Sequence, residues 1–314
     1  MEICLARVTA VFRPLTLLDD TIPRMGILLG LLTALTWGGA DFVARFATHR
    51  MGTLRTMLYM QFIGFILLTI LLPWLGGWGH LADGSGLQPW AWGFVAGFFN
   101  AFSCLALYRA FEIGKMSVVA PISASYPALT LLISRLSGER LSSARVAGIV
   151  IILFGVVIVA GGEHAPDDIE GQPVQKNRRG IGWAAVASIG FGLLFWLLGI
   201  RIIPRVGAIQ TVWMIRLTST VLTAAVILLA KQPIRLPRGN VRWMSLGMGV
   251  FDTLAFVLSN RGMQMEQVAV ISVLGSLYGA VTVGLASIFL SEHVSRWQWA
   301  GIVTIFAGIF LISR

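Results

Sequence analysis

Three charged side chains lie well inside long apolar stretches of this 314-residue sequence, and they are the first candidates for chemistry: Asp41, Arg216 and Asp252. An ionised group inside a bilayer is energetically costly, so it usually pairs with an opposite charge or faces a water-filled path. A carboxylate in such a place can contact a substrate or exchange a proton. All three are therefore candidate coupling groups, provided that the apolar stretches cross a membrane.

Asp252 and Arg216 lie at depths that allow them to meet. Asp252 is 11 residues into its stretch, which at 1.5 Å per residue is about 16 Å deep, and Arg216 is about 21 Å from the same surface. We expect an ion pair between them if their two helices touch. The alternative is an arginine that extends toward the nearer membrane surface.

Asp41 differs because Arg45 follows it one helical turn later. An ion pair within one helix is a sufficient structural explanation of Asp41, and a coupling role is the alternative. For Asp252, a substrate contact or a titrating carboxylate is the favoured interpretation, and a buried hydrogen bond between helices is the alternative.

The composition places these charges in a membrane protein. Apolar residues make up 56% of the chain and charged residues 12%, whereas a soluble domain carries about a quarter charged residues. The mean hydropathy is +0.81. An ordinary soluble enzyme and a disordered chain are thereby excluded. The net charge of +10 comes from basic residues in short loops, which we expect to meet anionic lipid headgroups rather than nucleic acid.

The sequence contains no recognisable metal, cofactor or catalytic motif, so we expect a protein that is not an enzyme and has no cofactor or metal. Cys4 and Cys104 are far apart, and neither a GxxxxGK[ST] nor an HExxH motif occurs. Two aspartates could suggest an intramembrane aspartyl protease, in which carboxylates share a proton, but its Tyr-Asp and Gly-x-Gly-Asp contexts are missing. The histidines fall in connecting segments: His49, His80, His164 and His293.

Ten apolar windows are long enough to cross a bilayer as helices, since a crossing takes about 20 residues and a lipid-exposed backbone must satisfy its own hydrogen bonds. The predicted fold class is an all-α integral membrane protein with ten transmembrane helices. The windows are 26–46, 54–75, 89–109, 116–136, 144–162, 181–202, 209–230, 241–261, 267–290 and 297–313.

The two halves of the chain resemble each other along their whole length, which indicates an internal duplication. The correspondences, at offsets of 152 to 154 residues, include Gly38 with Gly192, Asn100 with Asp252, Tyr126 with Tyr278, and Gly148 with Gly301. Because each half has five helices, the halves must cross the membrane in opposite directions, as in many secondary transporters.

The duplication sets the expected domain boundaries. The first repeat is 25–162, a polar linker is 163–179, and the second repeat is 180–314. Residues 1–24 do not match this pattern and are expected to be a disordered or mis-assigned extension, with Met25 as the native start. A short interfacial segment is the alternative.

Neutral residues in the spans complete the candidate binding site. Asn100 and Asp252 place a polar group at the same level of both halves, and Pro121 and Pro127 are expected to break the fourth helix and free backbone carbonyls. For any single aromatic residue, packing in the core is the alternative interpretation. The candidate substrate-binding residues are Trp37, Asn100, Ser123, Tyr126, Asp252, Ser272, Ser276 and Tyr278.

Several motifs resemble those of the drug/metabolite transporter superfamily, in the form with two EamA-type repeats. They are Thr36-Trp37-Gly38-Gly39-Ala40, the run from Val119 to Pro127, Gly138-Glu139-Arg140-Leu141 with Gly148 and Gly155, and Ser291-Glu292-His293-Val294 with Gly301 and Gly308. The glycine pairs are expected to pack the fifth and tenth spans closely. We expect Glu139 and Glu292 to be structural and to pair with nearby Arg140, Arg145 or Arg296.

The resemblance implies a function and an arrangement. It implies a secondary transporter in the cell membrane that exports an amino-acid-like or drug-like metabolite by alternating access. The central cavity would be lined by spans one, three, four, six, eight and nine, and both termini would be cytoplasmic. Protons are the candidate coupling ion, and a homodimer is an open alternative. The alternative functions are a facilitative channel and a lipid or polyprenyl carrier.

Overall fold

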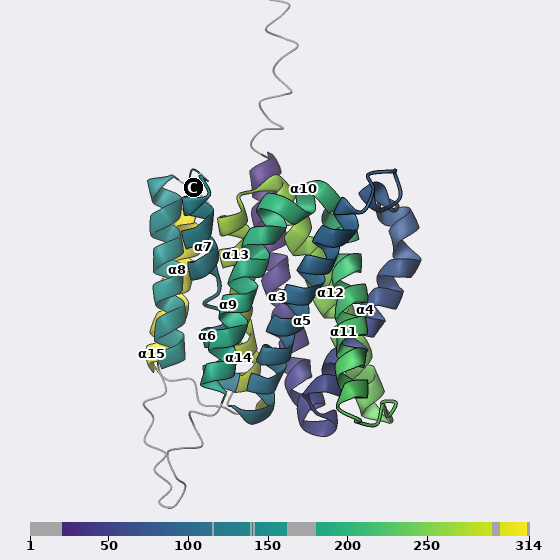
Figure 1. Ribbon diagram of the computed structural model, residues 1–314. Helices are drawn as coiled ribbons and strands as arrows, with labels where there is room; N and C mark the ends of the chain where they lie inside the picture. Colours follow the sequence, from purple (N-terminus) through teal and green to yellow (C-terminus); the bar gives the residue numbers. More distant parts are fainter. Residues whose placement is uncertain are drawn as a thin grey trace, which may run out of the picture.

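The computed structural model describes residues 21–114, 116–138, 140, 142–161, 180–290 and 296–312, and these residues form a bundle of helices (Figure 1). The first half contains α3 (Thr21–Met51), α4 (Thr53–Leu75), the short η1 (Gly79–Leu81), α5 (Gln88–Ile113), α6 (Met116–Ser123), α7 (Pro127–Leu136) and α8 (Ser143–Gly161). The second half contains α9 (Ile181–Leu197), η3 (Leu198–Ile202), α10 (Ile203–Val206), α11 (Ala208–Leu229), α12 (Asn240–Met265), α13 (Val268–Ser276), α14 (Tyr278–Leu290) and α15 (Arg296–Ile312).

These helices make up the ten predicted spans. Eight stretches are long and apolar enough to cross a membrane, and shorter apolar helices in α8 and α15 complete the set. The fourth span is α6 with α7, the sixth is α9 with η3 and α10, and the ninth is α13 with α14. The chain is thus a multi-pass membrane protein, and the predicted all-α fold class is confirmed.

Some predicted boundaries differ from the structure. Helix α3 begins at Thr21, so residues 21–24 of the predicted extension are helical. Pro23 is compatible with this because the first turn of a helix has no intrahelical partner for its N–H groups. His49 lies in the last turn of α3 rather than in a connection. Residues 1–20, the linker 163–179, Glu139 and residues 291–294 lie outside the described residues.

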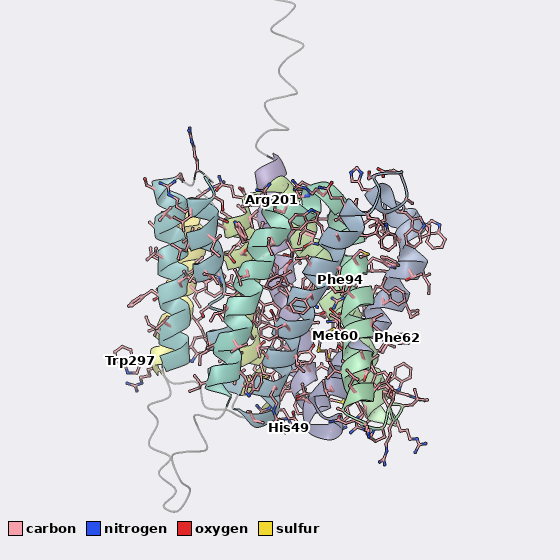
Figure 2. All side chains as sticks on the ribbon, viewed as in Figure 1. His49, Met60, Phe62, Phe94, Arg201 and Trp297 are labelled. Atoms are coloured by element: carbon pink, nitrogen blue, oxygen red, sulfur yellow. The ribbon has the colours of Figure 1, made fainter. Side chains whose placement is uncertain are left out.

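The two halves run in opposite directions through the bundle, as the odd number of helices predicts. Helix α3 begins at the upper face in Figure 1, and Figure 2 places His49 near its other end at the lower face. Helix α9 begins at the lower face, and Arg201 near the end of the sixth span lies at the upper face. Equivalent helices also pack in equivalent ways: α3 on α12 and α9 on α5, with α4 on α11 and α8 on α15.

Two glycines show which residues of α4 and α11 occupy equivalent positions in the two halves. Gly52 (φ 81°, ψ 162°) and Gly207 (φ 96°, ψ 152°) share a backbone conformation that disfavours a side chain, and each directly precedes one of these helices. They are 155 residues apart. Because both helices then continue without a break over their first turns, Gln61 of α4 is equivalent to Arg216 of α11.

The fourth and ninth spans are both interrupted. The break between α6 and α7 precedes Pro127, as predicted, but the predicted break at Pro121 is wrong because this residue lies inside α6. The break between α13 and α14 falls at Leu277 with no proline near it. The hydroxyl of Ser276 turns back to the carbonyl oxygen of Val273 at 2.7 Å just before this second break. Backbone groups freed at such breaks are tolerated where they face a cavity or find a side-chain partner.

The glycine pairs pack α8 against α15, which confirms their predicted role. A Cβ atom on Gly155 would lie 2.8 Å from the carbonyl oxygen of Gly301, and one on Gly308 would lie 2.8 Å from that of Gly148. Side chains at these positions would therefore separate the two backbones.

We expect Gly308→Ala to lower the stability of the protein by about 1–3 kcal/mol, because the added methyl group overpacks this contact. The measurement is the melting temperature in detergent. Gly284→Ala is the matched control, since a Cβ atom there meets nothing within 4 Å and should leave the melting temperature unchanged or slightly raised. Equal effects of the two substitutions would contradict the close packing.

Candidate functional site: a central cavity with two carboxylates

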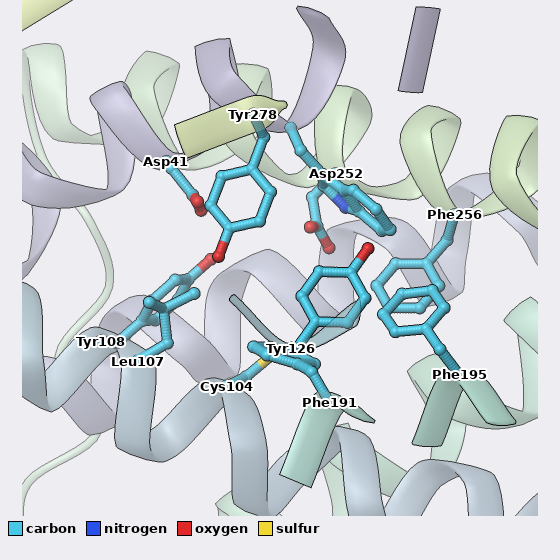
Figure 3. Close-up of a pocket in the computed structure, with 11 residues that line it drawn as sticks. Asp41, Cys104, Leu107, Tyr108, Tyr126, Phe191, Phe195, Asp252, Phe256 and Tyr278 are labelled. Atoms are coloured by element: carbon cyan, nitrogen blue, oxygen red, sulfur yellow. The ribbon is translucent and has the colours of Figure 1, made fainter. Parts of the chain in front are cut away.

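A cavity lies at the centre of the bundle and is lined by six spans (Figure 3). The spans are the first, third, fourth, sixth, eighth and ninth, which is the set that the family resemblance implies. The lining residues are Trp37 and Asp41 from α3, Cys104, Leu107 and Tyr108 from α5, Tyr126 at the break before α7, Phe191 and Phe195 from α9, Asp252 and Phe256 from α12, and Tyr278 from α14.

Aromatic rings form most of the cavity wall. Trp37 meets Phe195 and Phe256 edge to face, with ring centroids 5.6 and 5.1 Å apart, and Tyr126 stacks on Phe195 at 4.8 Å. The space open to the centres of water molecules is about 30 Å³, which is room for about two waters. The cavity is therefore narrow in this conformation, and an organic solute requires the surrounding helices to move apart.

Asp252 and Arg216 form the predicted ion pair in the middle of the bundle. The Arg216 Nη2 and Asp252 Oδ2 atoms are 2.6 Å apart, Arg216 is fully buried, and Asp252 is nearly so. The two groups are in contact as charges but are not aligned as a hydrogen bond. The alternative of an arginine that extends to a membrane surface is wrong.

Further contacts hold the Arg216 guanidinium in place. Its Nη1 donates to Gln61 Oε1 at 2.7 Å and approaches the Met60 sulfur at 3.4 Å, and its central carbon lies 5.1 Å from the centre of the Phe256 ring. Gly64 provides the space, since a Cβ atom there would lie 2.9 Å from Arg216 Cδ. Arg216 thus belongs to the wall behind the cavity and compensates the charge of Asp252.

Asp41 behaves differently from the prediction. It is buried and faces the cavity (Figure 3), and it makes no hydrogen bond or ion pair with any residue that the structure describes. The expected Asp41–Arg45 pair is therefore wrong, and Arg45 Nη1 is itself buried without a hydrogen-bond partner among those residues. The short aspartate side chain turns toward the cavity instead of along its own helix.

Two tyrosines tie the broken helices of the two halves together. The Tyr126 hydroxyl donates to the carbonyl oxygen of Ser272 at 2.8 Å, and the Tyr278 hydroxyl donates to Ser123 Oγ at 2.9 Å. Each tyrosine lies at the break of one half and reaches the broken helix of the other. The cavity therefore sits where both interruptions meet.

The remaining predicted residues lie beside the cavity and not in its lining. Asn100 donates to Ser219 Oγ at 3.1 Å and accepts from Cys104 at 3.6 Å. Ser123 and Ser272 hold the two tyrosines, and Ser276 bonds within its own helix. Five of the residues predicted from the sequence line the cavity: Trp37, Asp41, Tyr126, Asp252 and Tyr278.

Six lining residues were missed: Cys104, Leu107, Tyr108, Phe191, Phe195 and Phe256. Their spacing contains a usable signal. Cys104 and Phe256 lie one helical turn after the paired polar residues Asn100 and Asp252, and residues four apart share a helix face. Following that face from the polar pair would have found both.

Comparison with known proteins agrees with this architecture. Residues 24–161 and 178–314 each match the EamA-like transporter family. An uncharacterized protein of Methanocaldococcus jannaschii is 29% identical over 135 residues, which cover 43% of this chain and 95% of that protein. That relative is therefore about as long as one half of this chain.

A crystal structure of a protein has the same fold. It aligns with a TM-score of 0.71 and 20% identity, over 91% of this chain and 95% of that one. The two matched segments together span most of the sequence and coincide with the two inverted halves. The chain belongs to the EamA-like transporter family.

Proposed function

We propose that this protein is a secondary active transporter that exports a small metabolite by alternating access. The observation that carries the proposal is the narrow central cavity that residues of both inverted halves line. A binding site between two inverted, pseudosymmetric halves is typical of alternating access, whereas a facilitative channel or a lipid carrier does not require one. The membership of the EamA-like family supports the same function.

The charge of the cavity favours a cationic solute. Asp252 is compensated by Arg216, so Asp41 supplies the charge that has no partner among the described residues. A site with one free carboxylate and a wall of aromatic rings suits an organic amine or a quaternary ammonium group, which gains both ion pairing and cation–π attraction. The substrate class is therefore a small cation with an apolar body, which includes drug-like amines and amino-acid-like amines.

The same carboxylate can couple transport to protons. Asp41 can hold either the cationic solute or a proton, and the two compete for one site. Exchange of one for the other across the membrane links export to the proton gradient. Because Asp252 is paired with Arg216, the two aspartates do not form the proton-sharing pair that an aspartyl protease requires.

Flux into proteoliposomes tests the function directly. We expect proton-driven movement of cationic amines with aromatic or aliphatic bodies, and no movement of neutral isosteres that lack the charge. The screen also includes amino acids and nucleobases, with and without a proton gradient. Absence of flux for every solute would contradict a transporter, and equal flux of the cation and its neutral isostere would contradict the assigned substrate class.

A further inference from the structure

An ion pair at the upper face joins the two halves of the protein. Arg145, at the start of α8, binds Glu266 with both terminal nitrogens, at 2.8 and 3.1 Å. Glu266 follows the last residue of α12, and its side chain is only 5% exposed. A two-pronged contact between a guanidinium and a nearly buried carboxylate is among the stronger polar interactions of proteins.

Four spans meet at this ion pair. A Cβ atom on Gly26 of α3 would lie 2.8 Å from Glu266 Cβ, so α3 packs directly against the glutamate. Glu266 Oε1 also accepts the N–H of Gln267 at 2.8 Å, and Gln267 Nε2 donates to the Arg140 carbonyl oxygen at 3.1 Å. The upper ends of the first, fifth, eighth and ninth spans are thereby held together.

The lower face has no equivalent of this ion pair. The repeat places Gly114 at the position of Glu266, and both directly follow a helix in an extended conformation. It places Gln298 at the position of Arg145. A glycine and a glutamine cannot form an ion pair, so this contact between halves exists at one face only.

Among the residues that the structure describes, an ion pair of a different kind lies at the lower face. Arg109 and Glu112, 2.9 Å apart, lie in the same helix α5. Their equivalents at the upper face are Arg261 and Gln264, which form a neutral contact of 3.2 Å within α12. Neither pair crosses between the halves.

We propose that the Arg145–Glu266 ion pair is a latch that holds the upper face closed and biases the resting protein toward opening at the lower face. The inference rests on the proposed alternating access. If the halves were identical, the state closed above and the state closed below would have equal free energy, and a contact formed in only one state shifts that balance. With cytoplasmic termini, the latch would close the cytoplasmic side.

The larger cavity at the lower face fits this bias. It offers about 450 Å³ to the centres of water molecules. Residues from both halves line it, among them Thr53, Arg109, Trp183 and Gln232. Water therefore has access between helices of both halves at the face that lacks the latch.

The reactivity of the Cys104 thiol can show which face of the protein opens. It lines the central cavity and is buried, and the chain contains one other cysteine, Cys4. In a Cys4→Ser background, a membrane-impermeant thiol reagent reaches Cys104 only from a face that opens. Labelling rates in intact cells and in inverted vesicles compare the two faces. A second variant shows which preparation exposes the upper face to the reagent. It has no native cysteine and carries Ser143→Cys at the exposed start of α8, so it is labelled only where the upper face meets the reagent.

Glu266→Gln removes the charge and keeps an oxygen for the Gln267 N–H. We expect it to raise the Cys104 labelling rate from the upper face by about tenfold, the effect of losing one charge-assisted contact. Arg145→Gln should act alike, and the exchanged pair Arg145→Glu with Glu266→Arg should restore slow labelling. Glu112→Gln is the matched control, because it recreates the Arg261–Gln264 contact and should leave the rate unchanged.

Two results would overturn the latch. One is an upper-face rate in both Glu266→Gln and Arg145→Gln that equals the wild-type rate. The other is an increase in Glu112→Gln as large as in Glu266→Gln. Solute flux in the same vesicles separates this inference from the proposed function. If solute is transported but the latch variants do not change the labelling of Cys104, the latch alone is refuted. If the variants change the labelling but no solute is transported, the transport function alone is refuted.

Discussion

Replacing Arg216 with glutamine will destabilise the protein by about 3–5 kcal/mol, because it leaves Asp252 as an uncompensated buried charge. The arginine is fully buried, and Asp252 has no other cation within ion-pair distance among the described residues. The shorter, neutral side chain would keep at most a contact between amides with Gln61. The measurement is the melting temperature in detergent, together with the yield of folded protein.

The double variant Arg216→Gln with Asp252→Asn is the matched control. It gives the second half the residues that the first half already carries at the equivalent positions, Gln61 and Asn100. Because the double variant buries no charge, we expect it to recover most of the lost stability. A double variant that melts as low as the single variant would show that the ion pair is not what stabilises this region.

The second large effect is expected at Asp41. Asp41→Asn should abolish proton-driven export and remove the pH dependence of the flux, because the amide can neither release a proton nor pair with a cationic solute. The melting temperature should stay within about 1 kcal/mol of the wild-type stability, since the carboxylate has no partner among the described residues. Flux in proteoliposomes at several external pH values measures the effect.

Asp83 provides the control for Asp41. It is an exposed carboxylate in the loop before α5, and hydrogen bonds from Ser85, supported by one from His80, lower the pKa of Asp83 to about 2. It therefore stays ionised throughout the assay, and Asp83→Asn should leave both the flux and its pH dependence unchanged. Proton-driven flux in Asp41→Asn at the wild-type rate would contradict the coupling role.

The sequence predicted features that depend on long, repeated patterns. The ten spans follow from stretches of about 20 apolar residues, and the inverted halves follow from the offsets between pairs such as Tyr126 and Tyr278. The Arg216–Asp252 pair could also be predicted, since depth along a helix depends only on rise per residue. Because few charged residues lie in the middle of the membrane, each has few candidate partners for an ion pair.

Features set by side-chain direction could not be predicted. The spacing of Asp41 and Arg45 permits an ion pair, but the side chain of Asp41 lines the central cavity instead. No proline in the sequence indicates the break at Leu277, and the next residue, Tyr278, bonds to Ser123 of the first half. Arg145 and Glu266 are 121 residues apart, and only the packing of α8 against the end of α12 brings them together.

Gln61 and Arg216 occupy equivalent positions in the two halves, differ in type and contact each other. Equivalent residues that touch lie close to the axis relating the halves, and these two are 2.7 Å apart. In an ancestral assembly of two identical half-length chains, this position would have met its own copy, and an arginine would have faced an arginine. A glutamine can bond to its own copy, but a charged residue needs a different partner. In a single chain the two positions can carry different residues, so an arginine and its aspartate can stand in one half only.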